Sequence, residues 1–303
     1  MQKDLKNNIP NFLIVGAAKS GTTTVSYYLE RHDEVFMATP KEPKHFSYNY
    51  AKYTGPGDVA FTQKKATKTL KDYFKLFDKS QKFKCIGEAS VDNLYYHDKV
   101  IPDIKKHLGD PKIIILLRHP VDRAISAYSH LVRDDRENLT FEEALEIENS
   151  RLEKGYEFIW GYKQCGFYHD QVKSYIDSFS NVKICFFEDL VSSPQETINE
   201  ITDFLSISRI PIDKDLRLNI SGKPKNKIIN SLISRDTILR RSLARLVGKD
   251  LAIRIKSTIQ KNNLEKIEIS SQLKADLNAC FLEDYKKLEE LLDEDLAHWV
   301  KKY

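Results

Sequence analysis

The sequence predicts an α/β protein in which a doubly wound parallel sheet is flanked by helices and followed by a helical C-terminal part. Three short apolar runs, at 12–15, 112–117 and 182–187, carry this prediction. Runs of this length and composition are typical of strands that are buried on both faces of a parallel sheet. Each run leads directly into a helical pattern, and strands that alternate with helices build such sheets.

A helix is expected immediately after the second strand. Pro120 suits its first turn, because the N–H group that proline lacks has no partner within a helix at that position. Apolar side chains then recur at helical spacing through Val121, Ile125, Tyr128 and Leu131.

Two further helix starts carry capping signals. After the third strand, Ser193, Pro194 and Glu196 have the order of a capping box with proline at the first helical position. Thr140 and Glu143 have the same spacing and predict a second capping box at the start of a short helix.

The rest of the chain reads as helical. An amphipathic helix is expected over 164–179, and apolar spacing with a charged outer face predicts a helix over 271–292. Strand signals stop from about residue 226. Because there are no internal repeats and no low-complexity linkers, we expect 1–303 to form a single domain, with the helical C-terminal extension from about 226 packed on it.

Charge and composition narrow the partners. The net charge of +4 and the pI of about 8.6 suit an anionic ligand but are too weak for a dedicated nucleic-acid binder. The N-terminal residues lack a secretory pattern, and the longest purely apolar run, 113–117, is far short of the ~20 residues of a membrane-spanning helix. We therefore expect a cytoplasmic protein with no membrane insertion.

The cysteines give no sign of a metal site. Cys85, Cys165, Cys185 and Cys280 lie far apart in the sequence, without a CxxC pair or a histidine at zinc-binding spacing. Reduced and mostly buried thiols are the expectation, with no bound metal.

The first strand runs into a loop that is suited to phosphate. Residues 16–24 read GAAKSGTTT, and a helix is expected to begin immediately afterwards. Small residues let backbone N–H groups point at an anion, the helix N-terminus adds partial positive charge, and Lys19 can neutralise phosphate oxygens. The sequence thus predicts a P-loop-like strand, loop and helix unit.

This loop departs from the nucleoside-triphosphatase pattern GxxxxGK[ST], because Thr22 stands in place of the lysine and Lys19 lies three residues earlier. It resembles the 5′-phosphosulfate loop of the sulfotransferases that use 3′-phosphoadenosine-5′-phosphosulfate (PAPS). The resemblance is to bacterial members, with distant similarity to the heparan sulfate sulfotransferases. It implies that Lys19 and the amides of Ser20, Gly21, Thr22 and Thr23 hold the 5′-phosphate and sulfate, without a metal.

Residues 116–126 resemble the 3′-phosphate site of the same family. Arg118 follows the second strand and would present a planar fork of donors to phosphate, and Ser126, eight residues on, would add a hydroxyl. Residues 219–226 resemble the loop that closes over the nucleotide in bacterial members. Either Lys223 or Lys225 would reach the 3′-phosphate, and the sequence does not decide between them.

The turn at 38–46, which contains Lys-Glu-Pro, resembles the family segment in which a glutamate removes the acceptor proton. Glu42 would be this base, and Lys19 would stabilise the leaving group. Glu42 could instead pair with Lys41 or Lys44 on a solvated loop. His45 is the rival base, because cytosolic small-molecule sulfotransferases use histidine.

Further resemblance at 87–90, 166–168, 187–190 and 296–299 extends over nearly the whole chain. It implies transfer of a sulfuryl group from PAPS to a hydroxyl or amine of a small-molecule or glycan acceptor, with release of adenosine 3′,5′-bisphosphate. Two alternatives stay open: a P-loop kinase-like phosphoryl transferase, and a noncatalytic nucleotide- or glycan-binding module. The kinase requires a lysine beside the loop threonine, and the binding module would not turn PAPS over.

Overall fold

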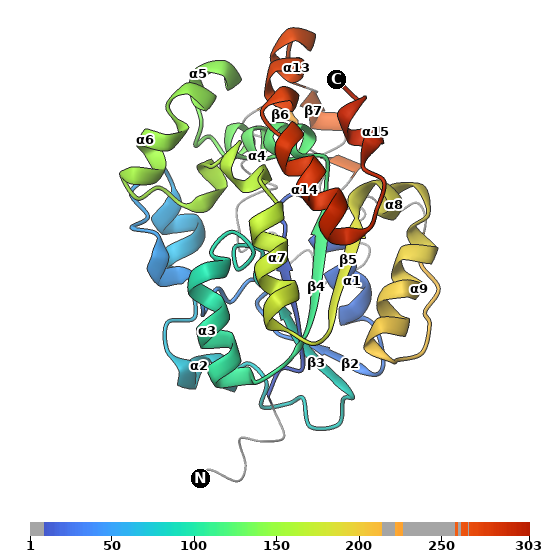
Figure 1. The fold of residues 1–303 in the computed structure, drawn as a ribbon. Helices are drawn as coiled ribbons and strands as arrows, with labels where there is room; N and C mark the ends of the chain where they lie inside the picture. Colours follow the sequence, from blue (N-terminus) through green and yellow to red (C-terminus); the bar gives the residue numbers. More distant parts are fainter. Residues whose placement is uncertain (1–8, 214–221, 227–257, 260–261, 266) are drawn as a thin grey trace.

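A five-stranded parallel sheet forms the centre of the molecule in the computed structural model, which describes residues 9–213, 222–226, 258–259, 262–265 and 267–303 (Figure 1). The strand order is β2-β3-β1-β4-β5. The strands are β1 (Phe12–Gly16), β2 (Val35–Met37), β3 (Cys85–Ala89), β4 (Lys112–Leu117) and β5 (Val182–Phe186). The predicted α/β fold with a parallel sheet is confirmed, and β1, β4 and β5 are the three predicted strands.

Helices cover both faces of the sheet (Figure 1). Alternate strand residues face opposite ways, so Leu13 belongs to one core cluster and Ile14 to another. On one face lie α3 (His97–Leu108), α4 (Pro120–Arg133) and α7 (His169–Ser178); on the other lie α1 (Thr22–Glu30), α8 (Phe187–Ser192) and α9 (Pro194–Leu205). Strands buried on both faces explain why their sequences are continuous apolar runs.

The remaining elements surround this core (Figure 1). They are α2 (Leu70–Lys75), α5 (Phe141–Glu146), α6 (Glu148–Glu153), α13 (Ser271–Ala279), α14 (Leu282–Leu292) and α15 (Ala297–Val300), with the short helices η2 (Tyr48–Tyr50), η3 (Val59–Gln63), η4 (Phe158–Trp160) and η5 (Gln164–Gly166). None of the helices in the described ranges combines the length and the apolar character that a membrane crossing requires.

One of the two predicted capping boxes is present. The Thr140 hydroxyl accepts from the amide of Glu143 (3.3 Å), and the Glu143 carboxylate accepts from the amide of Thr140 (2.8 Å). The prediction of a capping box at Ser193 is wrong, because the Ser193 side chain makes no capping hydrogen bond to α9. Ser193 also ends α8, where its amide donates to the Asp189 carbonyl (2.8 Å), and its backbone follows that turn.

Three helical predictions need correction. The segment 164–179 is not one helix: η5 ends at Gly166, and α7 begins at His169, where the Asp284 carboxylate accepts from its amide (3.1 Å). The segment 271–292 is two helices, because α13 ends at Ala279 and α14 begins at Leu282. Strands also occur beyond residue 226, since β7 (Leu264–Glu265) pairs with β6 (Lys223–Pro224).

The C-terminal residues dock against the start of α4. Trp299 is fully buried and packs edge-on against His119 and Tyr285, with ring centroids 6.0 and 5.6 Å apart. Its carbonyl oxygen lies 3.1 Å from His119 Nε2. The end of the chain therefore supports the junction between β4 and α4.

This packing predicts the effect of truncating Trp299. Trp299→Ala removes a fully buried indole, and we expect it to lower the free energy of unfolding by about 3–5 kcal/mol. Val300, the next residue, is 42% exposed, so Val300→Ala should change stability by less than about 0.5 kcal/mol. Urea denaturation of both variants measures the difference. Equal stabilities would show that the C-terminal residues do not hold the junction.

Candidate active site

The chain crosses from β3, on one side of β1, to β4 on the other, so the carboxyl end of β1 is the topological switch point of the sheet. Ligands of open α/β sheets bind at such points. A cleft of about 440 Å³ opens there. Its lining includes Lys19, Gly21, Thr22, Thr23, Glu42, Lys44, Phe61, Lys65, Arg118, Ser126, His130, Arg133, Asp134, Arg136, Glu157, Phe158 and Phe187.

The loop after β1 presents a helix N-terminus to the cleft. Gly21 caps α1 in the left-handed conformation, with φ of 89°, and no side chain makes a capping bond there. The first amides of α1 are therefore left for a ligand. Glycine is required twice over, because a Cβ at Gly21 would meet Leu190 at 2.6 Å and the left-handed conformation disfavours other residues. Ser20 is buried beneath this turn, and its amide donates to Ala17 (3.3 Å).

Lys19 is the cation at the centre of the cleft. Burial, followed by the charge of Arg133 and then that of Arg118, lowers the pKa of Lys19 to about 7, although Asp134 and Glu42 act in the opposite direction. A lysine of this kind is only partly charged at neutral pH. A bound anion would restore its charge, so the site favours phosphate or sulfate.

Arg118 joins the two predicted phosphate segments. Its guanidinium donates to the carbonyl oxygen of Lys19 (3.0 Å) and lies 4.4 Å from the ring centre of Phe187. Its Nε is buried and has no hydrogen-bond partner among the described residues. Ser126, which lies in α4, lines the same cleft. The structure thus brings Lys19, Arg118 and Ser126 together in one cleft.

Glu42 reaches the cleft from the Lys-Glu-Pro turn. One carboxylate oxygen lies 2.9 Å from Lys41 Nζ and the other 3.6 Å from Lys44 Nζ. Burial opposes ionisation of Glu42, but Lys41, Lys44 and Lys19 outweigh it and lower its pKa to about 2. Glu42 is therefore ionised at neutral pH and can accept a proton.

Lys44 is held in a buried charge network. Its ammonium lies 3.3 Å from Asp92 and 3.5 Å from Glu157, and these carboxylates with Glu42 raise its pKa despite burial. Glu157 in turn pairs with Arg136 (3.3 Å). Lys44 is thus a fixed positive charge beside Glu42, and not part of a solvated loop.

The Glu42 turn is also held through its backbone. Glu42 and Lys44 both have positive φ, 59° and 53°, which non-glycine residues adopt only when surrounding contacts hold them. The Lys44 amide donates to Ser90 Oγ (2.9 Å), and Ser90 donates to Glu88 (2.8 Å). Burial raises the pKa of Glu88 to about 8.

His45 does not line this cleft. Its Nδ1 lies 3.0 Å from the Thr67 carbonyl oxygen, its ring stacks on Tyr73 at 4.9 Å, and burial lowers its pKa. Lys223 and Lys225 are exposed at the β6 hairpin and do not line the cleft either. The structure therefore brings Glu42 to Lys19. Four predicted residues do not line the cleft: Ser20, which is buried under the loop, and His45, Lys223 and Lys225.

Sequence reasoning missed most of the residues that line the cleft. His130 and Arg133 lie on α4 after Ser126, at spacings of four and seven residues that place them on one helix face, so helical periodicity could have found them. Phe61, Arg136 and Glu157 come from segments with no motif. Only the fold brings them to the cleft.

A left-handed loop, an uncapped helix N-terminus and clustered cations define a phosphate-binding α/β protein. Comparison with known proteins gives the family: a model of the sulfotransferase family matches residues 10–211, so the chain belongs to the sulfotransferase family. The crystal structure of a sulfotransferase from Alicyclobacillus acidocaldarius is 32% identical, with a TM-score of 0.74, and the match covers 96% of this chain and 98% of that one.

Curated relatives are more distant. Heparan sulfate glucosamine 3-O-sulfotransferase 3B1 of Mus musculus is 27% identical over 213 residues, which are 70% of this chain and 50% of that protein. The membrane-associated sulfotransferase kil1 of Dictyostelium discoideum is 31% identical over 121 residues, which are 40% of this chain and 22% of that protein. The chain thus spans half or less of these relatives.

The lowered pKa of Lys19 predicts proton uptake on anion binding. At pH 8, Lys19 with a pKa of about 7 is mostly neutral. Bound phosphate raises the pKa of Lys19, so Lys19 should take up a proton when adenosine 3′,5′-bisphosphate binds. We expect an uptake of about 0.7 to 1 proton per bound nucleotide. Calorimetry at pH 8 in buffers of different ionisation enthalpy measures the uptake. Lys19→Met should abolish it, and identical heats for the wild type in all buffers would contradict the charge assignment.

Arg118 gives a second prediction. Arg118→Lys replaces a planar fork with a point charge, and we expect it to weaken binding of adenosine 3′,5′-bisphosphate by about 1.5–3 kcal/mol, or 10- to 150-fold. Arg209→Lys is the matched control, because Arg209 pairs with Asp203 on the surface, away from the cleft. Calorimetry in excess chelator compares them. Unchanged affinity in Arg118→Lys would remove Arg118 from the site.

Proposed function

We propose that this enzyme transfers a sulfuryl group from PAPS to a hydroxyl group of a glycan acceptor and releases adenosine 3′,5′-bisphosphate. The observation that carries the proposal is the meeting of Lys19, Arg118 and Glu42 in one cleft. Two features fit a donor with phosphates at both ends: the uncapped N-terminus of α1 and the guanidinium of Arg118 in the cleft lining.

The donor is assigned to the two strand-to-helix junctions. Lys19 and the first amides of α1 would hold its 5′ end, and Arg118 with Ser126 would hold the 3′-phosphate. Ser20, Gly21, Thr22 and Thr23 shape the first junction. Lys223 and Lys225 remain proposals for a contact to the 3′-phosphate, since their hairpin lies next to α4.

Glu42 is proposed as the general base. As the acceptor oxygen bonds to sulfur, its proton passes to the Glu42 carboxylate, and the bond between sulfur and the bisphosphate oxygen breaks. Negative charge grows on that oxygen, and Lys19 stabilises it. PAPS supplies the sulfuryl group when it is bound. Lys44 contacts Glu42 (3.6 Å) and is itself held by Asp92 (3.3 Å) and Glu157 (3.5 Å), so the carboxylate of Glu42 has a fixed neighbour.

A glycan acceptor has two supports. Relatives with 27% identity carry the name of heparan sulfate glucosamine 3-O-sulfotransferases. The cleft also carries residues that the donor does not require: Phe61, 40% exposed, and Lys65, whose ammonium lies 5.8 Å from the Phe61 ring centre. An aromatic face beside a cation suits a sugar ring that bears an anionic group.

Substitution of Glu42 tests this function. Glu42→Gln keeps the shape of the side chain but cannot take the proton, so we expect turnover to fall by roughly 10² to 10⁴. The affinity for adenosine 3′,5′-bisphosphate should stay nearly unchanged. Release of bisphosphate from labelled PAPS, with a heparan-type oligosaccharide as acceptor, measures turnover.

The matched comparison is His45→Asn. His45 contacts Tyr73 and lies outside the cleft lining, so this variant should keep most of the activity. Turnover that survives in Glu42→Gln but is lost in His45→Asn would reverse the assignment of the base. If both variants remain fully active, the base lies elsewhere.

A further inference from the structure

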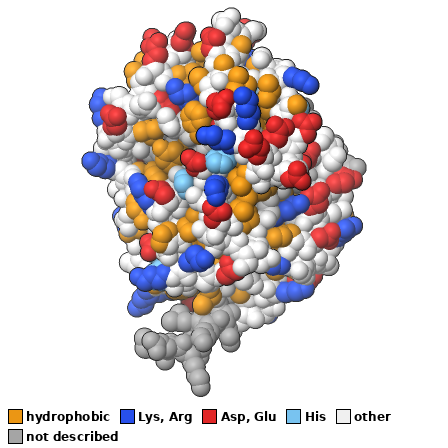
Figure 2. Space-filling view, in the orientation of Figure 1, with side chains coloured by type: hydrophobic (Ala, Val, Ile, Leu, Met, Phe, Trp, Pro, Cys, Tyr) orange, Lys and Arg blue, Asp and Glu red, His pale blue; other side chains and the backbone are white. Residues whose placement is uncertain are grey.

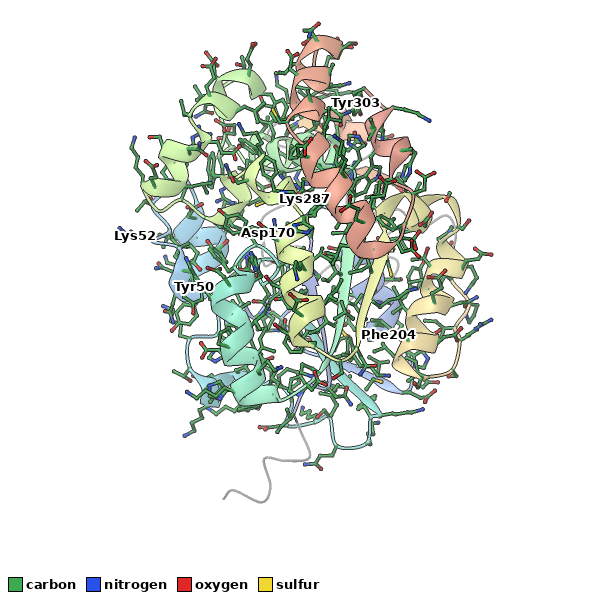
Figure 3. All side chains as sticks on the ribbon, in the orientation of Figure 1. Tyr50, Lys52, Asp170, Phe204, Lys287 and Tyr303 are labelled. Atoms are coloured by element: carbon green, nitrogen blue, oxygen red, sulfur yellow. The ribbon has the colours of Figure 1, made fainter. Side chains whose placement is uncertain are left out.

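A second pocket, of about 510 Å³, lies beside the N-terminal end of α3. Its walls come from η2, the start of α3, the end of α6 and the start of α7. In Figure 3, the labelled Tyr50 and Asp170 lie on either side of this end of α3. It shares no lining residue with the cleft at β1, and its volume is in the range of roughly 300–1,000 Å³ for small-ligand sites.

The walls of this pocket are aromatic. Tyr50, Tyr95, Tyr96, Tyr156 and Phe167 all line it. The Tyr50 and Tyr96 rings are 5.8 Å apart, and Tyr95 stands edge-on to Tyr96 at 5.0 Å. Figure 2 shows hydrophobic side chains, a class that there includes tyrosine, gathered with histidines near the centre of this face. Rigid rings of this kind offer faces for stacking at small entropic cost.

The tyrosine hydroxyls are available to a ligand. Tyr50 donates to the Lys99 carbonyl (3.3 Å), but Tyr95, Tyr96 and Tyr156 make no hydrogen bond through their hydroxyls to any described residue. They are also absent from the polar atoms that are sealed from solvent without a partner. Three hydroxyls that can both donate and accept therefore belong to residues that line one pocket.

Charge selects the ligand class. Asp98 and Asp170 are exposed at the pocket, and the one ammonium is Lys99, 5.5 Å from the ring centre of Tyr50. Two carboxylates against one ammonium disfavour a polyanion such as a nucleotide. Aromatic faces, free hydroxyls and carboxylates together match a neutral saccharide, which offers C–H faces for stacking and hydroxyls for hydrogen bonds.

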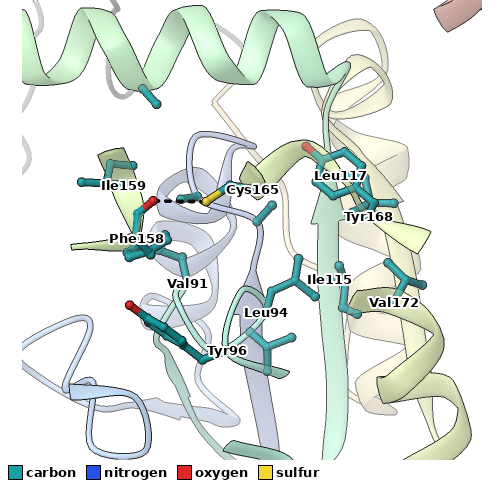
Figure 4. Close-up of a cluster of buried hydrophobic side chains, with 14 of the residues drawn as sticks. Val91, Leu94, Tyr96, Ile115, Leu117, Phe158, Ile159, Cys165, Tyr168 and Val172 are labelled. Carbon is teal, nitrogen blue, oxygen red and sulfur yellow. Dashed lines mark hydrogen bonds between the residues drawn. The ribbon is translucent and has the colours of Figure 1, made fainter. Parts of the chain in front are cut away.

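The pocket backs onto the acceptor side of the cleft. Phe158 lines the cleft, and its ring centre lies 6.0 Å from that of Tyr95. It lies 6.3 Å from the ring centre of Tyr96, and Figure 4 labels both of these residues. Consecutive residues also divide between the two cavities, since Tyr156 lines the pocket and Glu157 lines the cleft. One short segment, 156–158, thus forms the wall between them.

We infer that this tyrosine-lined pocket is a second saccharide-binding site, which takes neutral sugar units of the acceptor glycan away from the hydroxyl that is sulfated. The inference rests on the proposed glycan acceptor. It assigns the anionic part of the glycan to the cleft and a neutral part to the pocket, so the two cavities divide recognition by charge.

The test uses the full chain with saturating adenosine 3′,5′-bisphosphate on a glycan array that carries neutral and anionic oligosaccharides. Neutral oligosaccharides that bind are then titrated by calorimetry. Tyr50→Ala and Tyr156→Phe should each weaken their binding, by about tenfold for the lost aromatic face of Tyr50. Tyr48→Ala is the matched control, because Tyr48 bonds to Lys68 and lines neither cavity, and it should bind like the wild type.

Binding that falls in both pocket variants, with bisphosphate affinity unchanged, supports the second site. Failure of every neutral oligosaccharide to bind would overturn it. So would binding that is unchanged in both pocket variants but lost in Lys65→Ala, because the ligand would then sit in the cleft. These binding measurements do not depend on turnover. The second saccharide site can therefore be refuted while the transferase function is upheld, and the transferase function can be refuted while the second site is upheld.

Discussion

Positive charge is crowded around Lys19, and the chemistry of the cleft depends on this crowding. Arg133 and Arg118 lie near an ammonium that is itself shielded from solvent, and its pKa falls to about 7. An anion beside this ammonium stabilises its charged form, so the site favours phosphate or sulfate. In the proposed reaction, the same ammonium stabilises the negative charge that grows on the leaving group.

The fold supplies this arrangement from separate junctions. Lys19 comes from the loop after β1, Arg118 from the end of β4, and a hydrogen bond between them fixes their spacing. Trp299 supports the second junction from the far end of the chain. Glu42 comes from the turn that also contains Lys44. The backbone amide of Lys44 donates a hydrogen bond to Ser90, which directly follows β3. Each of these three site residues is thus connected to a strand end of one sheet.

The sequence predicts the parts of this design that are local. Short apolar runs predict β1, β4 and β5. No such run marks β2, which has only three residues, or β3, which contains Gly87 and Glu88. The loop and its family resemblance place Lys19, Arg118 and Glu42. Nothing local predicts that Asp92 and Glu157 hold Lys44, or that His45 turns to Tyr73, because those contacts join segments far apart in the chain.

The central claim, that the cleft holds a nucleotide with a phosphate at each end, is tested most directly by nucleotide discrimination in calorimetry. In excess chelator, adenosine 3′,5′-bisphosphate should bind at least about tenfold more tightly than adenosine 5′-monophosphate, because Arg118 gains a charged hydrogen-bond partner only from the 3′-phosphate. Equal affinity for these two nucleotides, with tighter binding of ATP and Mg²⁺, would contradict the account.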